Sequence, residues 1–232
     1  MLKYTTGLIL LLLLASCSSL HEITTLPTDQ YHITAKQYQA ITGRVYTGRT
    51  KKARVNLKLE ADSLKFQPLN EPPPPTSFQL EEIKDLRFHR HTFDVDVFTI
   101  PFKIRLAMNG FPTQLNPNFS GTVYLGRRHD YYRIQAIPKH SDRPFKITGV
   151  GYGYGGILGI GAVTMNPFVT QNYITYEYDG FVLTGGAAGI YDAKKFNLGL
   201  AMGTDLLLDK NRKHWLYQGK PWLGILFGIN LN

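Results

Sequence analysis

An all-β fold, closed as a small antiparallel β-barrel of about eight strands, is the fold class that the sequence predicts for residues 78–232. The composition supports this fold, because 14 Tyr, 13 Phe and 22 Gly occur among 232 residues, as is usual for strands joined by tight turns. The pattern supports it as well, since large apolar residues alternate with small or polar ones in long runs. The chain after the first residues shows no convincing helical period and no apolar run long enough for a transmembrane helix.

The strands are predicted from this alternation, which is most regular in 98–108, 119–126, 149–162, 196–206 and 222–231. In 149–162, glycine fills the face opposite to the large apolar side chains. Glycine weakens a soluble strand, but in a narrow barrel it makes room inside for bulky neighbours. One large apolar face and one small or polar face are typical of strands that span a membrane. Aromatic residues near the predicted strand ends suit an interfacial girdle: Tyr173, Tyr176, Tyr178, Trp215, Tyr217 and Trp222.

The expected strand number follows from how the segments are divided. The alternation in 98–108 is one segment, with Phe98, Ile100, Phe102 and Ile104 on a single apolar face. Residues 128–130 are interpreted as a turn that separates two further strands. About seven segments of this kind are counted, and because membrane barrels of one chain normally have an even number of strands, an eighth is expected from 78–91.

The chain resembles bacterial outer-membrane β-barrel proteins in the run from Gly149 to Ala162, the strand from Phe196 to Leu208 and the ending from Gly219 to Asn232. The resemblance covers about residues 94–232 and is one of pattern. It implies the fold and a membrane location, but no particular activity. In such proteins the last strand commonly ends in an aromatic residue, whereas this chain ends Leu231-Asn232.

The N-terminus resembles the lipobox signal of bacterial lipoproteins: Lys3 precedes an apolar stretch, which leads into Leu14-Ala15-Ser16-Cys17. We therefore expect a signal peptide at 1–16, acylation (palmitate) at Cys17, and a tether at 17–40. A small β-rich segment with a Pro-rich connection should follow at 41–77, and the barrel at 78–232. The expected location is the outer membrane, with the anchor on the periplasmic side. An ordinary secretory signal is the alternative.

The formal charge is +9, which would suit anionic partners. An exported lipoprotein does not meet nucleic acid, so the expected partners are outer-membrane lipids and lipopolysaccharide phosphates. Lys210, Arg212, Lys213 and Trp215 form a basic hairpin tip with an aromatic flank, and they are the candidate headgroup contacts. A merely solubilising surface charge is the alternative.

Charged residues on the face opposite to the apolar one should meet inside the barrel, since charges are costly in lipid. The predicted lumen charge network consists of Lys103, Arg105, Glu177, Asp179 and Asp205. A salt-bridged, structural interior is expected, and a polar conduit or proton-sensitive gate is the alternative.

No motif indicates a catalytic residue, a metal site or a cofactor. The stretch 151–156 matches G-x-G-x-x-G, but that fingerprint needs a helix after it, and strand-like alternation runs straight through. His89 and His91, followed by Asp94 and Asp96, are interpreted as strand residues rather than metal ligands.

The sequence thus favours a non-enzymatic, lipid-anchored component of the outer membrane, structural or accessory, which could belong to an envelope protein complex. Two alternatives stay open. One is a lipid-active barrel enzyme, which would need a serine–histidine pair or a similar geometry. The other is a soluble periplasmic all-β lipoprotein that binds an envelope partner.

Overall fold

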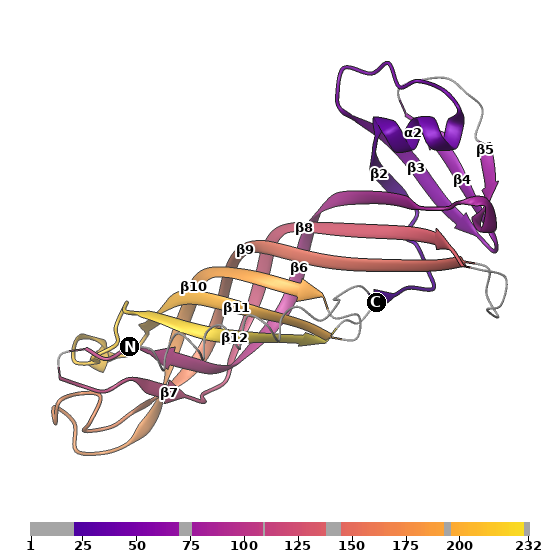
Figure 1. The fold of residues 1–232 in the computed structure, drawn as a ribbon. Coiled ribbons are helices and arrows are strands. Elements are labelled where there is room, and N and C mark those ends of the chain that lie inside the picture. The colour runs from indigo at the N-terminus through magenta and orange to yellow at the C-terminus, as the bar shows by residue number, and fades with distance from the viewer. Residues whose placement is uncertain (1–20, 70–75, 109, 138–144, 193–195, 230–232) are drawn as a thin grey trace, which may run out of the picture. The chain divides into compact units, whose positions relative to one another are not determined.

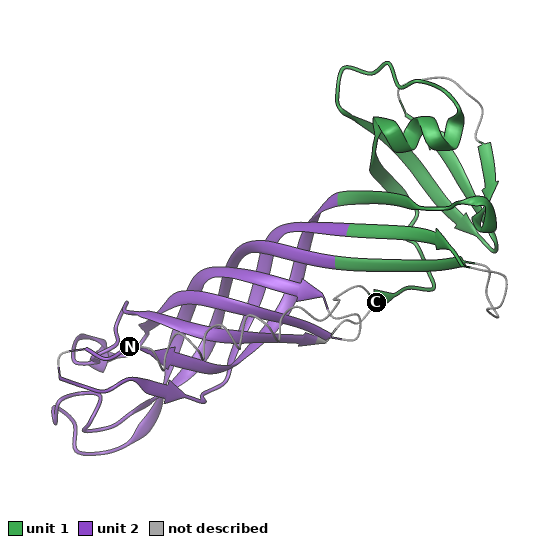
Figure 2. Ribbon diagram, viewed as in Figure 1, with its two compact units in different colours: residues 1–90, 131–150 green, residues 91–130, 151–232 purple. Residues whose placement is uncertain are grey.

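The computed structural model describes residues 21–69, 76–108, 110–137, 145–192 and 196–229. These residues form a mostly antiparallel sheet of 12 strands (Figure 1). The chain divides into two compact units, unit 1 with residues 1–90 and 131–150 and unit 2 with residues 91–130 and 151–232 (Figure 2). The signal peptide, Cys17, the proline run at 71–75 and the last two residues lie outside the described residues.

Three long strands contribute residues to both units: β6 (Leu86–Arg105), β8 (Ser120–Ala136) and β9 (Phe145–Met165). Unit 1 also holds β1 (His21–Glu22), β2 (Asp29–Thr34), α2 (Ala35–Thr42), β3 (Lys52–Glu60), β4 (Ser63–Pro68), β5 (Thr76–Gln79) and the 3-10 helix η1 (Leu80–Glu82). Unit 2 also holds β7 (Gln114–Asn116), β10 (Tyr178–Asp192), β11 (Phe196–Leu207), the 3-10 helix η2 (Lys210–Lys213) and β12 (Pro221–Ile229).

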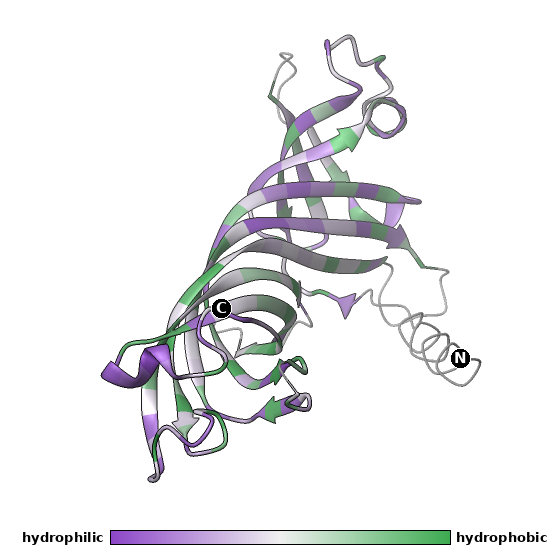
Figure 3. Cartoon of the chain, turned by 90° about the vertical axis from the view of Figure 1, so that its left-hand side faces the viewer, coloured by the Kyte–Doolittle hydropathy of each residue, from purple (hydrophilic) through white to green (hydrophobic). Residues whose placement is uncertain are grey.

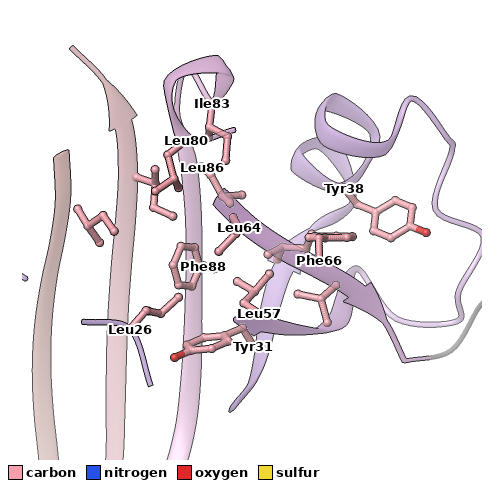
Figure 4. Close-up of a cluster of buried hydrophobic side chains, with 14 of the residues drawn as sticks. Leu26, Tyr31, Tyr38, Leu57, Leu64, Phe66, Leu80, Ile83, Leu86 and Phe88 are labelled. Carbon is pink, nitrogen blue, oxygen red and sulfur yellow. The ribbon is translucent and has the colours of Figure 1, made fainter. Parts of the chain in front are cut away.

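Unit 1 is built around an antiparallel meander, in which β2, β3, β4 and β5 pair in chain order. Alternation sends every second side chain inward, so that Val55, Leu57, Leu64 and Phe66 are fully buried. Figure 4 shows these strands and η1 contributing to one hydrophobic cluster, in which Phe88 of β6 also lies. A tight turn joins β3 to β4, whose register pairs Glu60 with Ser63.

The segment expected to be a tether, 17–40, includes β2 and most of α2. The order arises because Tyr31, Ile33 and Tyr38 supply buried side chains to the core of unit 1. At the start of α2 the Thr34 hydroxyl accepts a hydrogen bond from the Gln37 N–H, and the helix ends at Gly43 with φ of 68°. A helix of 8 residues with one buried side chain leaves no helical period, which explains why the pattern did not predict it.

Unit 2 contains a closed ring of six strands, β6, β8, β9, β10, β11 and β12, in which β12 pairs back onto β6. The antiparallel all-β arrangement is as predicted, but the ring is smaller than the expected eight strands. β8 continues without a turn through 128–130, and residues 86–91 are the beginning of β6 rather than a separate strand. Two pairs of predicted strands are therefore single long strands.

The alternation predicts the two faces correctly for residues 120–126 of β8, for 149–162 of β9, and for β11 and β12. On β11, for instance, Leu198, Leu200 and Met202 are exposed, whereas Asn197 and Ala201 are buried. Figure 3 shows the corresponding apolar and polar bands along the strands. The stretch that matches G-x-G-x-x-G lies within β9, which continues as a strand on both sides of it.

The prediction fails within β6, because its faces switch near Pro101. Ile225 of β12 pairs with Phe102, but Phe227 pairs with Thr99, so β6 has one extra residue there, as in a β-bulge. Phe98 and Ile100 therefore point inward and are buried, while Phe102 is exposed. Proline lacks an N–H group for the ladder, which suits it to a bulge.

The ring interior is filled by side chains. Phe98, Tyr124, Trp222 and Leu226 are nearly inaccessible and belong to one apolar cluster. They pack over inward-facing glycines: a Cβ on Gly153 would lie 2.9 Å from the Tyr124 hydroxyl. Six strands enclose little space, and glycine leaves that space to the large side chains of neighbouring strands.

Candidate functional site

The inner face of β6 shows how the ring interior is ordered. Along this strand the inward positions run from carboxylates, Asp94 and Asp96, through the apolar Phe98, to the cations Lys103 and Arg105. Two charged groups are therefore separated by an apolar layer. We call them the acidic cluster (Asp94, Asp96, Arg128, Asp130, Asp192) and the basic cluster (Lys103, Arg105, Thr184, Asp205).

The basic cluster is a buried network centred on one carboxylate. Lys103 Nζ lies 2.9 Å from Asp205 Oδ1, and Arg105 Nη2 donates to Asp205 Oδ2. The Thr184 hydroxyl donates to Asp205 Oδ1 at 2.7 Å and accepts from Lys103 Nζ at 3.1 Å. The β10–β11 register, which pairs Thr184 with Asp205, brings the hydroxyl to the carboxylate. All four side chains are buried.

Two cations share this one carboxylate, so the basic cluster carries one excess positive charge. Aromatic rings partly compensate it: Lys103 Nζ lies 4.8 Å from the Trp222 ring centroid, and the Arg105 guanidinium lies 5.0 Å and 5.3 Å from those of Trp215 and Tyr217. Nε and Nη1 of Arg105 are buried without a hydrogen-bond partner among the described residues. The cluster thus depends on Asp205 for most of its charge neutralisation.

The structure brings together three of the five residues predicted for the lumen network, Lys103, Arg105 and Asp205. Glu177 and Asp179 do not join them, because both side chains are exposed. Glu177 precedes β10, and Asp179 lies on the outer face of that strand, where it accepts a hydrogen bond from the Thr164 hydroxyl at 3.0 Å. Thr184 was not predicted, since only the strand register places it beside Asp205.

Of the four residues predicted to contact headgroups, three are exposed and one is buried. Lys210, Arg212 and Lys213 are exposed in η2, as a contact surface requires. Trp215 is not available to headgroups, because it is buried against Arg105. Its burial follows from the loop after β11, whose Trp215 and Tyr217 belong to a hydrophobic cluster with Leu207.

The acidic cluster was not predicted as a group, because residues 128–130 were interpreted as a turn. Arg128 lies on β8, where its Nε donates to Asp130 Oδ1 at 2.8 Å and its Nη2 donates to Asp192. Asp96 accepts a hydrogen bond from the Asn197 amide at 3.3 Å. Four carboxylates and one guanidinium leave an excess of three negative charges if all are ionised.

An apolar layer separates the inward positions of the two clusters. Phe98, Tyr124, Trp222 and Leu226 are each at most 1 % exposed, so the charges at either side belong to separate groups. This packing favours a structural interior over the alternative of a continuous polar conduit.

The histidines of β6 do not form a site with the nearby aspartates. His89 stacks on His32 and Tyr131, whereas His91 Nδ1 lies 2.6 Å from His129 Nδ1. Among the residues that the structure describes, no group of three or more His, Cys, Asp or Glu side chains is placed to hold a metal ion. In the same residues, no helix is long and apolar enough to cross a membrane.

Comparison with family models, with curated protein sequences and with solved structures finds no match to this chain.

Proposed function

We propose that unit 2 is a membrane-spanning β-barrel of six strands, and that the protein is a non-enzymatic, lipid-anchored structural component of the bacterial outer membrane. The observation that carries the proposal is the outer face of the ring. Every one of its strands exposes large apolar side chains, among them Phe181 at 73 %, Leu200 at 72 % and Ile160 at 64 %.

The apolar face extends around the ring over all six strands. It includes Phe93, Val95, Val97, Phe102, Ile104, Val123, Leu125, Tyr152, Tyr154, Leu158, Leu183, Leu198, Met202, Leu206, Leu223, Ile225 and Phe227. Soluble monomers rarely expose contiguous apolar patches larger than a few hundred Å². A lipid environment removes that cost, at about 25 cal/mol for each Å² of apolar surface taken from water.

The lengths of the last two ring strands are consistent with this role. β11 has 12 residues and β12 has 9, close to the roughly 9–11 that a tilted strand needs to cross the hydrocarbon core. Six strands are fewer than the usual minimum of about eight. The glycine-lined interior, filled by Phe98, Tyr124 and Trp222, supports closure at this smaller number and argues for a plugged barrel instead of a channel.

The lipobox-like sequence before Cys17 supports a second attachment to the membrane, through an acyl group such as palmitate. Cys17→Ala should abolish the incorporation of labelled palmitate and leave the signal peptide uncleaved. Equal processing of the variant and the wild type, with no lipid on either, would overturn this part of the proposal. Outer-membrane lipid is the expected partner, with lipopolysaccharide phosphates near Lys210, Arg212 and Lys213.

The experiment for the membrane face is a spin-label scan of β11 in liposomes. Nitroxides at Leu198→Cys, Leu200→Cys and Met202→Cys should collide with oxygen, which partitions into lipid, and should be protected from a water-soluble nickel complex. Ala201→Cys points inward and should be protected from both reagents. Val45→Cys, at a position of unit 1 that is 66 % exposed, is the control that the nickel complex should reach.

The scan also distinguishes the alternatives. Access of the nickel complex to the even positions of β11 would overturn the membrane proposal. Protection of those positions from both reagents would show that a protein partner covers the apolar face, as expected for a soluble lipoprotein of an envelope complex.

A further inference from the structure

Unit 1 has a cleft of about 640 Å³ that the membrane proposal does not use. It lies between α2, the first residues of β6 and the part of β8 that belongs to unit 1. Its lining includes three cations, Lys36, Arg87 and Arg133, and a single carboxylate, Asp85. The cleft thus carries an excess of two positive charges, and basic and acidic groups converge within it.

Asp85 holds both guanidinium groups in place. Arg133 donates to it twice, from Nε to Oδ1 at 2.7 Å and from Nη2 to Oδ2 at 3.1 Å, and Arg87 Nη2 donates to Oδ2 at 3.2 Å. The hydrogen bonds from Arg133, followed by the one from Arg87, lower the pKa of Asp85. The carboxylate therefore stays ionised at neutral pH, and it orients two planar donors before any ligand arrives.

The core of unit 1 fixes the walls of this cleft. Arg87 is exposed between Leu86 and Phe88, which are both buried, so the strand beneath it is anchored. The side-chain amide of Gln37 in α2 pairs with the backbone of Arg87. In the orientation that satisfies both groups, its oxygen accepts from the Arg87 N–H at 2.9 Å and its nitrogen donates to the Arg87 carbonyl. This pairing holds α2, and with it Lys36, beside β6.

Further positive charge lies behind the cleft. Lys52 Nζ is 3.1 Å from Nε2 of His89, which lines the cleft. Burial, followed by the charges of Lys52 and Arg54, lowers the pKa of His32, which stacks on His89. Lys52 beside His89, together with Arg54 near His32, adds positive charge to this side of unit 1, where an anion would be favoured.

We propose that this cleft binds a sugar phosphate. The phosphate would lie against Arg87, Arg133 and Lys36, whose donors suit its oxygens. A cleft of about 640 Å³ is much larger than a phosphate ion, and the polar groups of Thr34, Asp85 and Tyr131 in its lining can hydrogen-bond to sugar hydroxyls. The inference concerns unit 1 only and does not depend on the membrane proposal.

The test is a ³¹P NMR titration of the full chain in detergent micelles, with glucosamine 1-phosphate and with inorganic phosphate as separate probes. We expect the sugar phosphate to bind more tightly than the ion. Arg87→Gln should weaken its binding at least tenfold, and Arg87→Lys, which keeps the charge but loses the planar fork, should weaken it less. The matched control is Arg44→Gln, which removes one exposed positive charge of the same unit outside the cleft and should change binding less than twofold.

Three results would overturn the proposal: no binding of the sugar phosphate, equal binding of the sugar phosphate and the ion, or equal weakening by Arg87→Gln and Arg44→Gln. Folding of each variant is checked by amide hydrogen exchange of β3 and β4, which does not report on the cleft. Micellar lipid A, in which the glucosamine phosphates belong to a lipid, serves as a third probe. Tighter, Arg87-dependent binding of lipid A would identify the source of the ligand as a glycolipid, and preference for the soluble probe would identify it as a free sugar phosphate.

Discussion

The two units use the same strand alternation with opposite results. In unit 1, Leu57 and Phe66 are buried, and the other face of the same hairpin carries Lys58, Lys65 and Glu60, with Glu60 in ion pairs of 2.8 Å and 2.6 Å to the two lysines. In unit 2, most large apolar side chains of the strands are exposed, and the opposite face holds glycine, the paired charges of the basic cluster and a packed layer that includes Phe98 and Trp222.

The difference teaches that a period of two residues identifies two faces, but not the solvent of either one. The residue types on the less apolar face decide whether the apolar face points to a protein core or away from it. Lysine and glutamate on the less apolar face require water, so the apolar face must point to a protein core. Glycine and threonine do not require water, so in unit 2 the face that carries them can line the interior of a closed ring.

The largest effect should come from the basic cluster of unit 2, whose ion pairs are buried. Asp205→Ala leaves Lys103 and Arg105 buried without their carboxylate, and we expect it to destabilise the ring by about 3–5 kcal/mol. Heat-modifiability on gels, measured in detergent, should report a lower unfolding temperature. Asp179→Ala removes an exposed carboxylate of the same unit and should change stability by less than about 0.5 kcal/mol. Equal effects of the two variants would contradict the burial of the basic cluster.

The second prediction compares two phenylalanines. Phe66→Ala should cost unit 1 about 3–4 kcal/mol, because it opens a cavity in a close-packed core. Phe181→Ala in unit 2 removes a side chain that is 73 % exposed and should leave the free energy of unfolding in detergent nearly unchanged. Urea titration, followed by circular dichroism for the first variant and by gel shift for the second, measures both. A large loss for Phe181→Ala would mean that its ring packs against protein.

The third prediction compares two exposed apolar residues, Leu200 in unit 2 and Val45 in unit 1. Leu200→Arg should cost about 2–4 kcal/mol in a bilayer and reduce assembly, because the charge would face lipid. Val45→Arg should be neutral, since that side chain faces water. Refolding yields into liposomes give the comparison, and tolerance of arginine at both positions would argue that both units are surrounded by water.

The smallest effect is a pH dependence of unit 1. Burial and the nearby Lys52 and Arg54 lower the pKa of His32 below its ordinary value of 6.5, so the unfolded chain binds the proton more readily than the folded one. Stability that is present above pH 6.5 should therefore decrease as the pH falls toward the folded-state pKa. Amide exchange of β2 and β3 between pH 7 and pH 5 would show it. His32→Gln should flatten the dependence, and an unchanged slope in that variant would assign it to another group.

Local alternation by itself determined much of this protein. It identified the antiparallel all-β fold, the two faces of residues 120–126 of β8, of 149–162 of β9, and of β11 and β12, and the inward direction of Lys103, Arg105 and Asp205. These properties are encoded within a few neighbouring residues, because successive side chains of a strand point to opposite faces. The hairpin of β3 and β4 was predictable for the same reason.

Only the tertiary structure decided how many strands close the ring, where β6 changes face, and which side chains meet. The bulge near Pro101 is defined against β12, and the ion pair between Lys103 and Asp205 joins residues 102 positions apart. Strand register places Thr184 in the basic cluster, and loop packing places Trp215 against Arg105, whereas Glu177 lies outside. Arg87, Arg133 and Lys36 share a cleft for the same physical reason: they come from three elements whose positions are set by long-range pairing and by the burial of the core.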